Sequence, residues 1–114
     1  MAELRALQLF LAGRELTSLQ ARRNAAAGNF EAQTHRVFEL MDQTLRRAGG
    51  TLANLVTMTV FIKESRHGDR FVELRKGKFP DGRYPGSALI TVTNFARPGI
   101  ELEIQAIAVI GDRA

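Results

Sequence analysis

The chain contains no cysteine, and its only apolar run near the N-terminus, between Arg5 and Arg14, is short. Without cysteine there can be no disulfide, thiolate metal site or cysteine nucleophile, and such a composition is typical of the reducing cytoplasm. The apolar run is far below the ~20 residues that a membrane span needs, and no basic leader precedes it. We therefore expect a cytoplasmic protein without a membrane segment.

Runs of basic residues and clusters of histidine are also missing. Sixteen Lys and Arg against twelve Asp and Glu give a formal charge of +4, but the cations are scattered along the whole chain and aromatic residues make up 7%. Nucleic-acid binding is therefore not expected, whereas the net charge favours small anionic partners. His35 and His67 are isolated from each other, so we expect neither a metal site nor a cofactor.

The 114 residues, 45% of them hydrophobic, predict one compact domain over residues 1–114. A helix should begin after Asn29, a good N-cap, and end before Gly49 and Gly50. Between these ends one apolar stripe recurs at helical spacing, formed by Phe30, Val37, Phe38, Met41 and Leu45. A shorter helix is expected over residues 69–78, before the turn at residues 80–82.

Alternating apolar residues predict strands over residues 7–12, 55–63, 87–93 and 100–110, and a short strand over 15–19 is possible. In the strand 55–63 we expect Val56 to share a face with Met58, and Leu55 to lie on the other face. The last strand has a fully aliphatic face and a second face that begins acidic and ends aliphatic, which suits an interface with a cleft at one end. The fold class is α+β, with two helices on one face of a mixed sheet.

Three segments resemble the RidA (YjgF-like) family. They are GNFEAQTHRVFELMDQTLRRAGGTLANLVTMTVFIKES, FPDGRYPGSALITV and PGIELEIQAIAV, and the resemblance covers about residues 7–110. It implies a chorismate-mutase-like fold and a homotrimeric barrel, with the sheets inside and a cleft between each pair of neighbouring subunits. In deaminating members, an arginine stands two residues after the second proline of the second segment and pairs with the carboxylate of a 2-imino acid. Water then hydrolyses the imino acid to a keto acid and ammonia.

The family arginine is absent from this chain. Pro85 is followed by Gly86 and Ser87, so a serine occupies the arginine's position and supplies no charge. Four more positions of the family's cleft also depart from its pattern: Ala12, Arg14, Val72 and Leu89. Gly13 is retained, and Glu103 matches the glutamate that the family uses to hold or activate water or substrate.

The resemblance therefore implies a cleft lined by Gly13, Arg14, Ser87, Leu89 and Glu103. Glu103 is either a general acid or base there or an ordinary edge-strand carboxylate. Arg14 is either a surface residue or a replacement for the missing guanidinium. Neither histidine has a partner that would make it a base. A triad of Ser87, His67 and Asp69 lacks the glycine pattern of a nucleophile elbow.

Two functions remain open. One is a hydrolase or deaminase acting on an imine, enamine or related reactive metabolite, without the arginine-dependent mechanism. The other is a trimer that binds a metabolite or a partner and has no catalytic activity. Ribonuclease activity, which has been attached to the family's name, is not supported by the scattered arginines.

Overall fold

The computed structural model describes residues 4–12 and 29–111, which form a four-stranded sheet and two α-helices. The strands are β1 (Leu4–Ala12), β2 (Leu55–Ile62), β3 (Gly86–Thr91) and β4 (Leu102–Gly111), in the spatial order β1-β4-β2-β3. β4 pairs antiparallel with both β1 and β2, while β2 and β3 are parallel. The sheet is therefore mixed, as the sequence predicts, and the possible strand over 15–19 lies outside the described residues.

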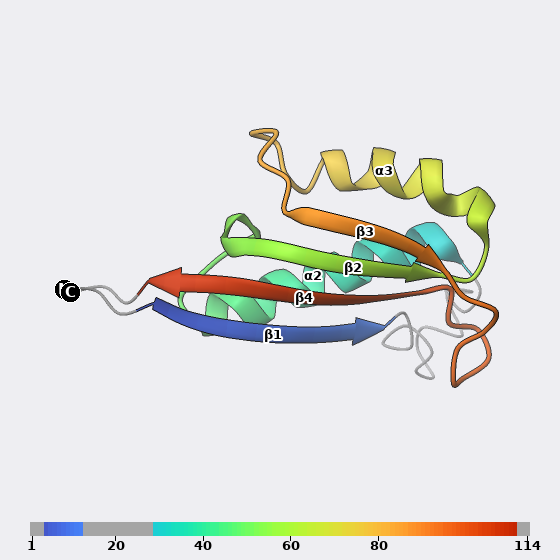
Figure 1. The fold of residues 1–114 in the computed structure, drawn as a ribbon, viewed down its shortest axis with the longest axis horizontal. Coiled ribbons are helices and arrows are strands. Elements are labelled where there is room, and N and C mark those ends of the chain that lie inside the picture. Colours follow the sequence, from blue (N-terminus) through green and yellow to red (C-terminus); the bar gives the residue numbers. More distant parts are fainter. Residues whose placement is uncertain (1–3, 13–28, 112–114) are drawn as a thin grey trace.

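The helix α2 (Phe30–Arg47) lies on one face of the sheet, behind the strands in Figure 1. The side chain of Asn29 caps its N-terminus by accepting a hydrogen bond from Ala32 N, as predicted. At its C-terminus Gly49 adopts a φ of 91°, and Gly49 N and Gly50 N donate to Arg46 O and Leu45 O. These two bonds form a Schellman motif, which explains why the helix needs a glycine at this point.

The second helix, α3 (Gly68–Lys76), follows a short 3₁₀-helix, η3 (Ser65–His67), and lies along the β3 side of the molecule in Figure 1. A further 3₁₀-helix, η2 (Leu52–Asn54), precedes β2. The parallel pair β2 and β3 is thus joined through α3, a βαβ crossover. No helix of residues 4–12 and 29–111 lies over the near face of the sheet in Figure 1, which we call the open face.

The hydrophobic core fills the space between α2 and the sheet. The strands β2 and β4 contribute alternate side chains to it, and α2 contributes its apolar stripe. The buried residues of β4 are Leu102, Ile104, Ala106, Ala108 and Ile110, and those of α2 include Val37, Phe38, Met41 and Leu45. The aliphatic face of the last strand is therefore the helix-facing one, as the alternation predicts.

The prediction for the start of β2 is wrong. Leu55 is 7% exposed and belongs to the core, whereas Val56 is 50% exposed. The register with β4 shifts here, because Leu55 pairs with Ala108 and Thr57 with Ile107, so that one extra residue lies in β2. This β-bulge inverts the alternation on its N-terminal side, and an alternating pattern in one strand does not reveal it.

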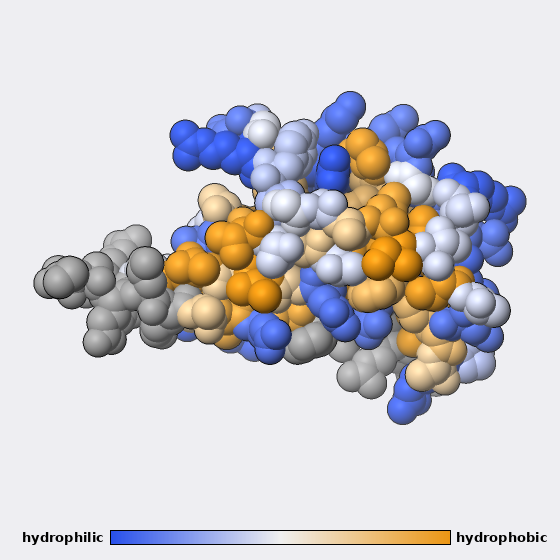
Figure 2. Space-filling model, in the orientation of Figure 1, coloured by the Kyte–Doolittle hydropathy of each residue, from blue (hydrophilic) through white to orange (hydrophobic). Residues whose placement is uncertain are grey.

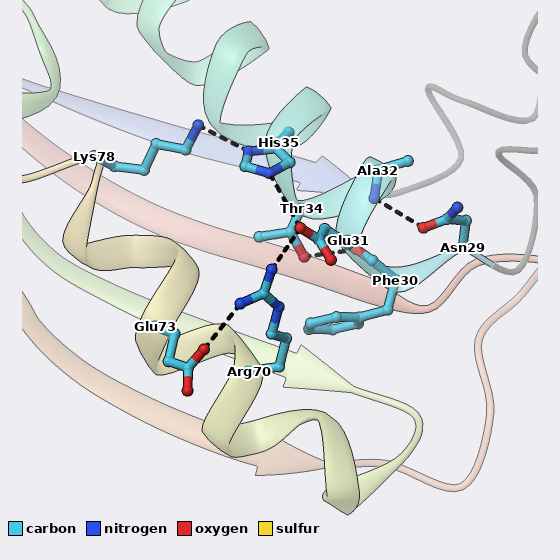
Figure 3. A network of polar contacts seen from close by, with 9 residues as sticks. All are labelled: Asn29, Phe30, Glu31, Ala32, Thr34, His35, Arg70, Glu73 and Lys78. Carbon is cyan, nitrogen blue, oxygen red and sulfur yellow. Dashed lines mark hydrogen bonds and ion pairs between the residues drawn. The ribbon is translucent and has the colours of Figure 1, made fainter.

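The two helices are joined by an exposed polar network at the N-terminal end of α2 (Figure 3). Arg70 of α3 donates to Glu31 of α2 at 2.6 Å and to Glu73 at 2.8 Å. On the other side of Glu31, His35 Nε2 lies 3.9 Å from the carboxylate, and its Nδ1 lies 3.1 Å from Lys78 Nζ. The network thus links α3 to the first turns of α2.

This network should make stability depend on pH in acid. The hydrogen bond from Arg70 is the main cause that lowers the pKa of Glu31 below its ordinary 4.5. The Glu31 carboxylate therefore binds a proton more readily in the unfolded chain than in the folded one. Its pair with Arg70 stabilises the folded chain above pH 4.5, and this stabilisation is lost as the pH falls through the lowered pKa. Denaturant titrations should show that Glu31→Gln loses a small, salt-sensitive amount of stability near neutral pH and none in strong acid.

A matched control is available on the same helix. Glu39 pairs with Arg36 at 2.7 Å, an ion pair confined to α2. Glu39→Gln removes the same charge without separating the helices, so its stability should follow the pH profile of the unmodified chain more closely. Equal pH profiles for Glu31→Gln and the unmodified chain would contradict the assignment.

Candidate functional site

Glu103 lies on the open face near the start of β4. Its backbone is paired with Ala12 of β1 on one side and with Phe61 of β2 on the other. The side chain is half-buried, and within residues 4–12 and 29–111 its carboxylate forms no hydrogen bond or ion pair. A carboxylate with unused acceptor positions is what a group that binds or moves a proton requires.

Ala12, the last described residue of β1, lies directly opposite Glu103. Gly13 and Arg14, the next two residues, lie outside the described residues. Their assignment to the cleft, and the reach of Arg14, therefore remain predictions.

Ser87 and Leu89 lie on the opposite face of the sheet. They pair with Met58 and Val60 of β2, whose side chains are buried against the helices. Neighbouring residues in a pair of strands point to the same face. The packing agrees, because a Cβ added to Gly68 at the start of α3 would lie 3.3 Å from Leu89 Cδ2. Ser87 and Leu89 therefore face the helix layer, at the exposed edge strand β3.

The structure thus does not bring Ser87 and Glu103 together within one chain. Glu103 is level with Phe61 and Ile90, which is three residues beyond Ser87 along β3. At about 3.3 Å per residue and about 4.8 Å per strand, roughly 10 Å along the strand and 10 Å across it separate them, with the sheet in between. A cleft lined by Ser87 and Glu103 requires two copies of the chain.

The open face of the sheet is largely apolar. Val56 and Ile90 are 50% and 43% exposed, and Phe61, Ile107 and Val109 are half-buried. Figure 2 shows two hydrophobic groups on this face with more polar side chains between them. A shallow hollow of about 100 Å³ is lined by Gln8, Thr57, Met58, Thr59, Gln105, Ala106 and Ile107. Two exposed apolar groups on one sheet face, with polar side chains between them, are typical of an interaction surface.

A larger hollow, about 630 Å³, lies on the helix side between α2, η2 and the turn after α3. Of the predicted site residues that the structure describes, Ser87, Leu89 and Glu103, none lines it. Its walls are charged, but Asp42 is bound by Arg46 at 2.8 Å and Glu39 by Arg36 at 2.7 Å. The carboxylates of Asp42 and Glu39 therefore already have partners, whereas that of Glu103 has none among the described residues.

The histidines do not form a catalytic constellation. The ring of His67 stacks on Phe30 with centroids 4.4 Å apart, and its buried Nδ1 has no hydrogen-bond partner in the described part of the chain. No hydrogen bond joins it to Ser87 or Asp69 among the described residues, so the triad is not assembled. Nor do residues 4–12 and 29–111 bring three His, Asp or Glu side chains together around a possible metal position.

Sequence reasoning missed one buried polar residue near this site. Gln33 is fully buried on α2, and its side chain binds the backbone at the entry of β4. The signal was present: Gln33 occupies a position of the apolar stripe, three residues after Phe30 and four before Val37. A polar side chain where the helical period requires an apolar one indicates a specific buried partner.

Comparisons with known proteins agree with this fold. Residues 6–110 match the model of the family described as Endoribonuclease L-PSP. A protein of unknown function of the Rid family from Yersinia pestis is 25% identical, with a TM-score of 0.69 and coverage of 73% of this chain and 65% of that one. A putative endoribonuclease from Thermotoga maritima is 32% identical, with a TM-score of 0.66 and coverage of 72% and 63%.

Other solved structures are more distant in sequence but cover more of both chains. A member of the YjgF/YER057c/UK114 family from Mycobacterium tuberculosis is 21% identical, with a TM-score of 0.74 and coverage of 96% and 81%. A protein of unknown function from Pseudomonas aeruginosa is 23% identical, with a TM-score of 0.78 and coverage of 95% and 93%. The chain thus spans less than two thirds of the Yersinia and Thermotoga proteins. No curated protein matches it.

Neither helix of the described residues combines the length and apolar character needed to cross a membrane.

Proposed function

Because the chain belongs to the RidA/YjgF-like family, we propose that it forms a homotrimer whose inter-subunit clefts bind a small anionic metabolite. The observation that carries the proposal is the placement of Ser87 and Leu89 on the face of the sheet opposite Glu103. Only neighbouring copies can place these residues in one cleft. The apolar open face supplies a surface on which the copies can associate.

Within this cleft Glu103 is the proposed proton carrier. In the hydrolysis of an imine, water adds to the carbon of the C=N bond, and the carbinolamine then expels ammonia to leave a carbonyl group. Glu103 would accept a proton from the attacking water and return it to the leaving nitrogen. A glutamate with a free carboxylate, as Glu103 has among the described residues, suits both steps.

Substrate binding must differ from that of the arginine-dependent members. The Ser87 hydroxyl is a neutral hydrogen-bond group, whereas a guanidinium binds a carboxylate with two charge-assisted hydrogen bonds. We propose that the anionic end of the ligand is held by Ser87 together with Arg14 and the backbone at Gly13. If these groups bind a metabolite without hydrolysing it, the protein is a binding trimer, and the neutral Ser87 is the observation that favours this second function.

The hydrolase proposal is tested by ammonia release. Imines generated from amino acids by an amino-acid oxidase should be hydrolysed faster with the protein than without it. Glu103→Gln should lower this rate at least about 10²-fold, the usual size of a general acid–base contribution. Glu64→Gln removes the same charge from an exposed residue after β2 and should leave the rate unchanged. A Glu103→Gln variant with full activity would contradict the proposed role of Glu103 as the proton carrier.

Binding without catalysis is separated by a second measurement. Thermal shifts with pyruvate, 2-oxobutanoate and other small carboxylates should reveal a ligand even where no ammonia is released. A shift without hydrolysis supports the binding trimer. If the protein shows no thermal shift with any of these carboxylates and also hydrolyses no imine, the metabolite proposal as a whole is contradicted.

A further inference from the structure

The side chain of Gln33 joins the helix layer to the entry of β4. Its Nε2 donates to Gly99 O at 2.6 Å, and its Oε1 accepts from Glu101 N at 2.8 Å. The side chain is fully buried, and its two partners lie 66 and 68 residues away in the sequence. One amide thus satisfies a backbone acceptor and a backbone donor that would otherwise be unpaired.

The segment that Gln33 binds is the long connection between β3 and β4, residues 92–101. This connection has no regular secondary structure, and half of its residues are exposed. At its start Val92 N donates to Ile62 O, and at its end Lys63 N donates to Glu101 O at 3.2 Å. Ile100, which lies between Gly99 and Glu101 in the sequence, is only 3% exposed. We call the two hydrogen bonds of Gln33 to Gly99 and Glu101, together with the buried Ile100, the anchor of the connection at its β4 end. Gln33 provides the polar part of this anchor.

The anchor is two residues before Glu103. Because side chains alternate along a strand, the orientation of Glu103 follows directly from the backbone at Glu101. Glu101 N is bound by Gln33 and Glu101 O by Lys63, so this residue is held from both the helix layer and the end of β2. If the anchor opened, β4 would lose order from its first residues inward, and Glu103 is the first of these on the open face.

We propose that Gln33 is a positioning residue that fixes the carboxylate of Glu103 in the inter-subunit cleft. This inference rests on the proposed function of the cleft. Gln33 itself is buried in the core and lies on α2, so it acts through the backbone of residues 99–101 rather than on a ligand.

The substitution Gln33→Glu tests the role through its dependence on pH. An ionised carboxylate at this position accepts from Glu101 N but cannot donate to Gly99 O, so two oxygens would face each other in a buried place. A protonated carboxyl has nearly the shape of the amide and restores the donor. Burial and the facing carbonyl both favour the protonated form. The defect should therefore be large in alkaline solution and should disappear in acid.

A matched control is the next residue along the helix. Thr34 is also fully buried, but its hydroxyl donates to Phe30 O within α2 and forms no hydrogen bond to the connection. Thr34→Val thus removes a buried hydrogen bond from the same turn of helix without opening the anchor. It should destabilise the protein without a pH-dependent effect on the cleft.

Two readouts are measured on the full chain between about pH 5 and pH 9, the range in which a buried carboxyl can titrate. The first is hydrogen exchange of the Glu101 amide and of the first residues of β4. The second is the Kd for 2-oxobutanoate, compared with that of the unmodified chain at each pH. For Gln33→Glu we expect exchange to accelerate and the Kd to rise about 10-fold or more in alkaline solution, with both returning to the unmodified values in acid. Thr34→Val should show neither change.

Three other outcomes would contradict the positioning role, and each does so for a different reason. If exchange at Glu101 is the same in Gln33→Glu and in the unmodified chain, the anchor is wrong whatever the ligand does. If exchange accelerates but the ratio of Kd values stays near one, Gln33 is only structural, and the proposed function stands without it. If the unmodified chain neither binds 2-oxobutanoate nor hydrolyses imines, the function proposed for the cleft fails, and the positioning role fails with it.

Discussion

The variant Ile107→Arg should be monomeric at concentrations where the unmodified chain is a trimer. Ile107 lies at the centre of the open face, paired with Gln8 of β1 and Thr57 of β2, and it borders the shallow hollow there. In the proposed trimer this face is covered by neighbouring copies. An arginine there would be buried without a partner, and an uncompensated buried charge costs about 3–5 kcal/mol.

Sedimentation velocity or light scattering measures this result directly. Gln43→Arg is the matched control, because it adds the same side chain at an exposed position of α2. This control should remain trimeric. A monomeric unmodified chain would contradict the trimer, and a trimeric Ile107→Arg variant would show that the copies associate through another surface.

Loss of the trimer should also remove any ligand response. In a monomer Ser87 and Glu103 remain on opposite faces of the sheet, so no single chain can complete the cleft. The oligomeric state and the activity are therefore expected to fail together in Ile107→Arg. Glu103→Gln, in contrast, should lose activity while remaining trimeric.

Much of the fold could be predicted because its signals are local. The cap at Asn29, the apolar stripe of α2 and the glycines that end it all lie within one helix, and each acts at the place where the sequence puts it. The alternation in β4 is equally local, and the burial of its aliphatic face follows from it. The bulge at Val56 could not be predicted in this way, since it depends on the register between two strands.

The candidate site was harder to predict because its residues belong to different layers. A sequence shows that Ser87 and Leu89 share one face of their strand, but not which face of the sheet this is. That depends on their pairing with Met58 and Val60, and the pairing depends on the crossover through α3. The partners of Gln33 are equally non-local, although its place in the apolar stripe of α2 marks it as unusual.

The largest loss of stability is expected at Phe38, which links α2 to the second helix. Its side chain is 1% exposed, and its ring lies 6.0 Å from the ring of Phe71 in α3 and 6.0 Å from that of Phe79 in the following turn. Phe38→Ala removes both contacts and leaves a cavity, which typically costs about 3–5 kcal/mol. Because small domains have about 5–15 kcal/mol of stability in total, much of it would be lost.

Tyr84 provides a control within the same aromatic cluster. It lies 5.9 Å from Phe79 and under the guanidinium of Arg75, but it is 41% exposed. Tyr84→Ala therefore leaves no enclosed cavity in the core and should cost clearly less than Phe38→Ala. Denaturant titrations at one protein concentration measure both variants, since association with other copies would shift the midpoint. Equal losses for the two variants would show that the cluster stabilises through ring contacts alone, and that the core between α2 and α3 does not depend on the volume of Phe38.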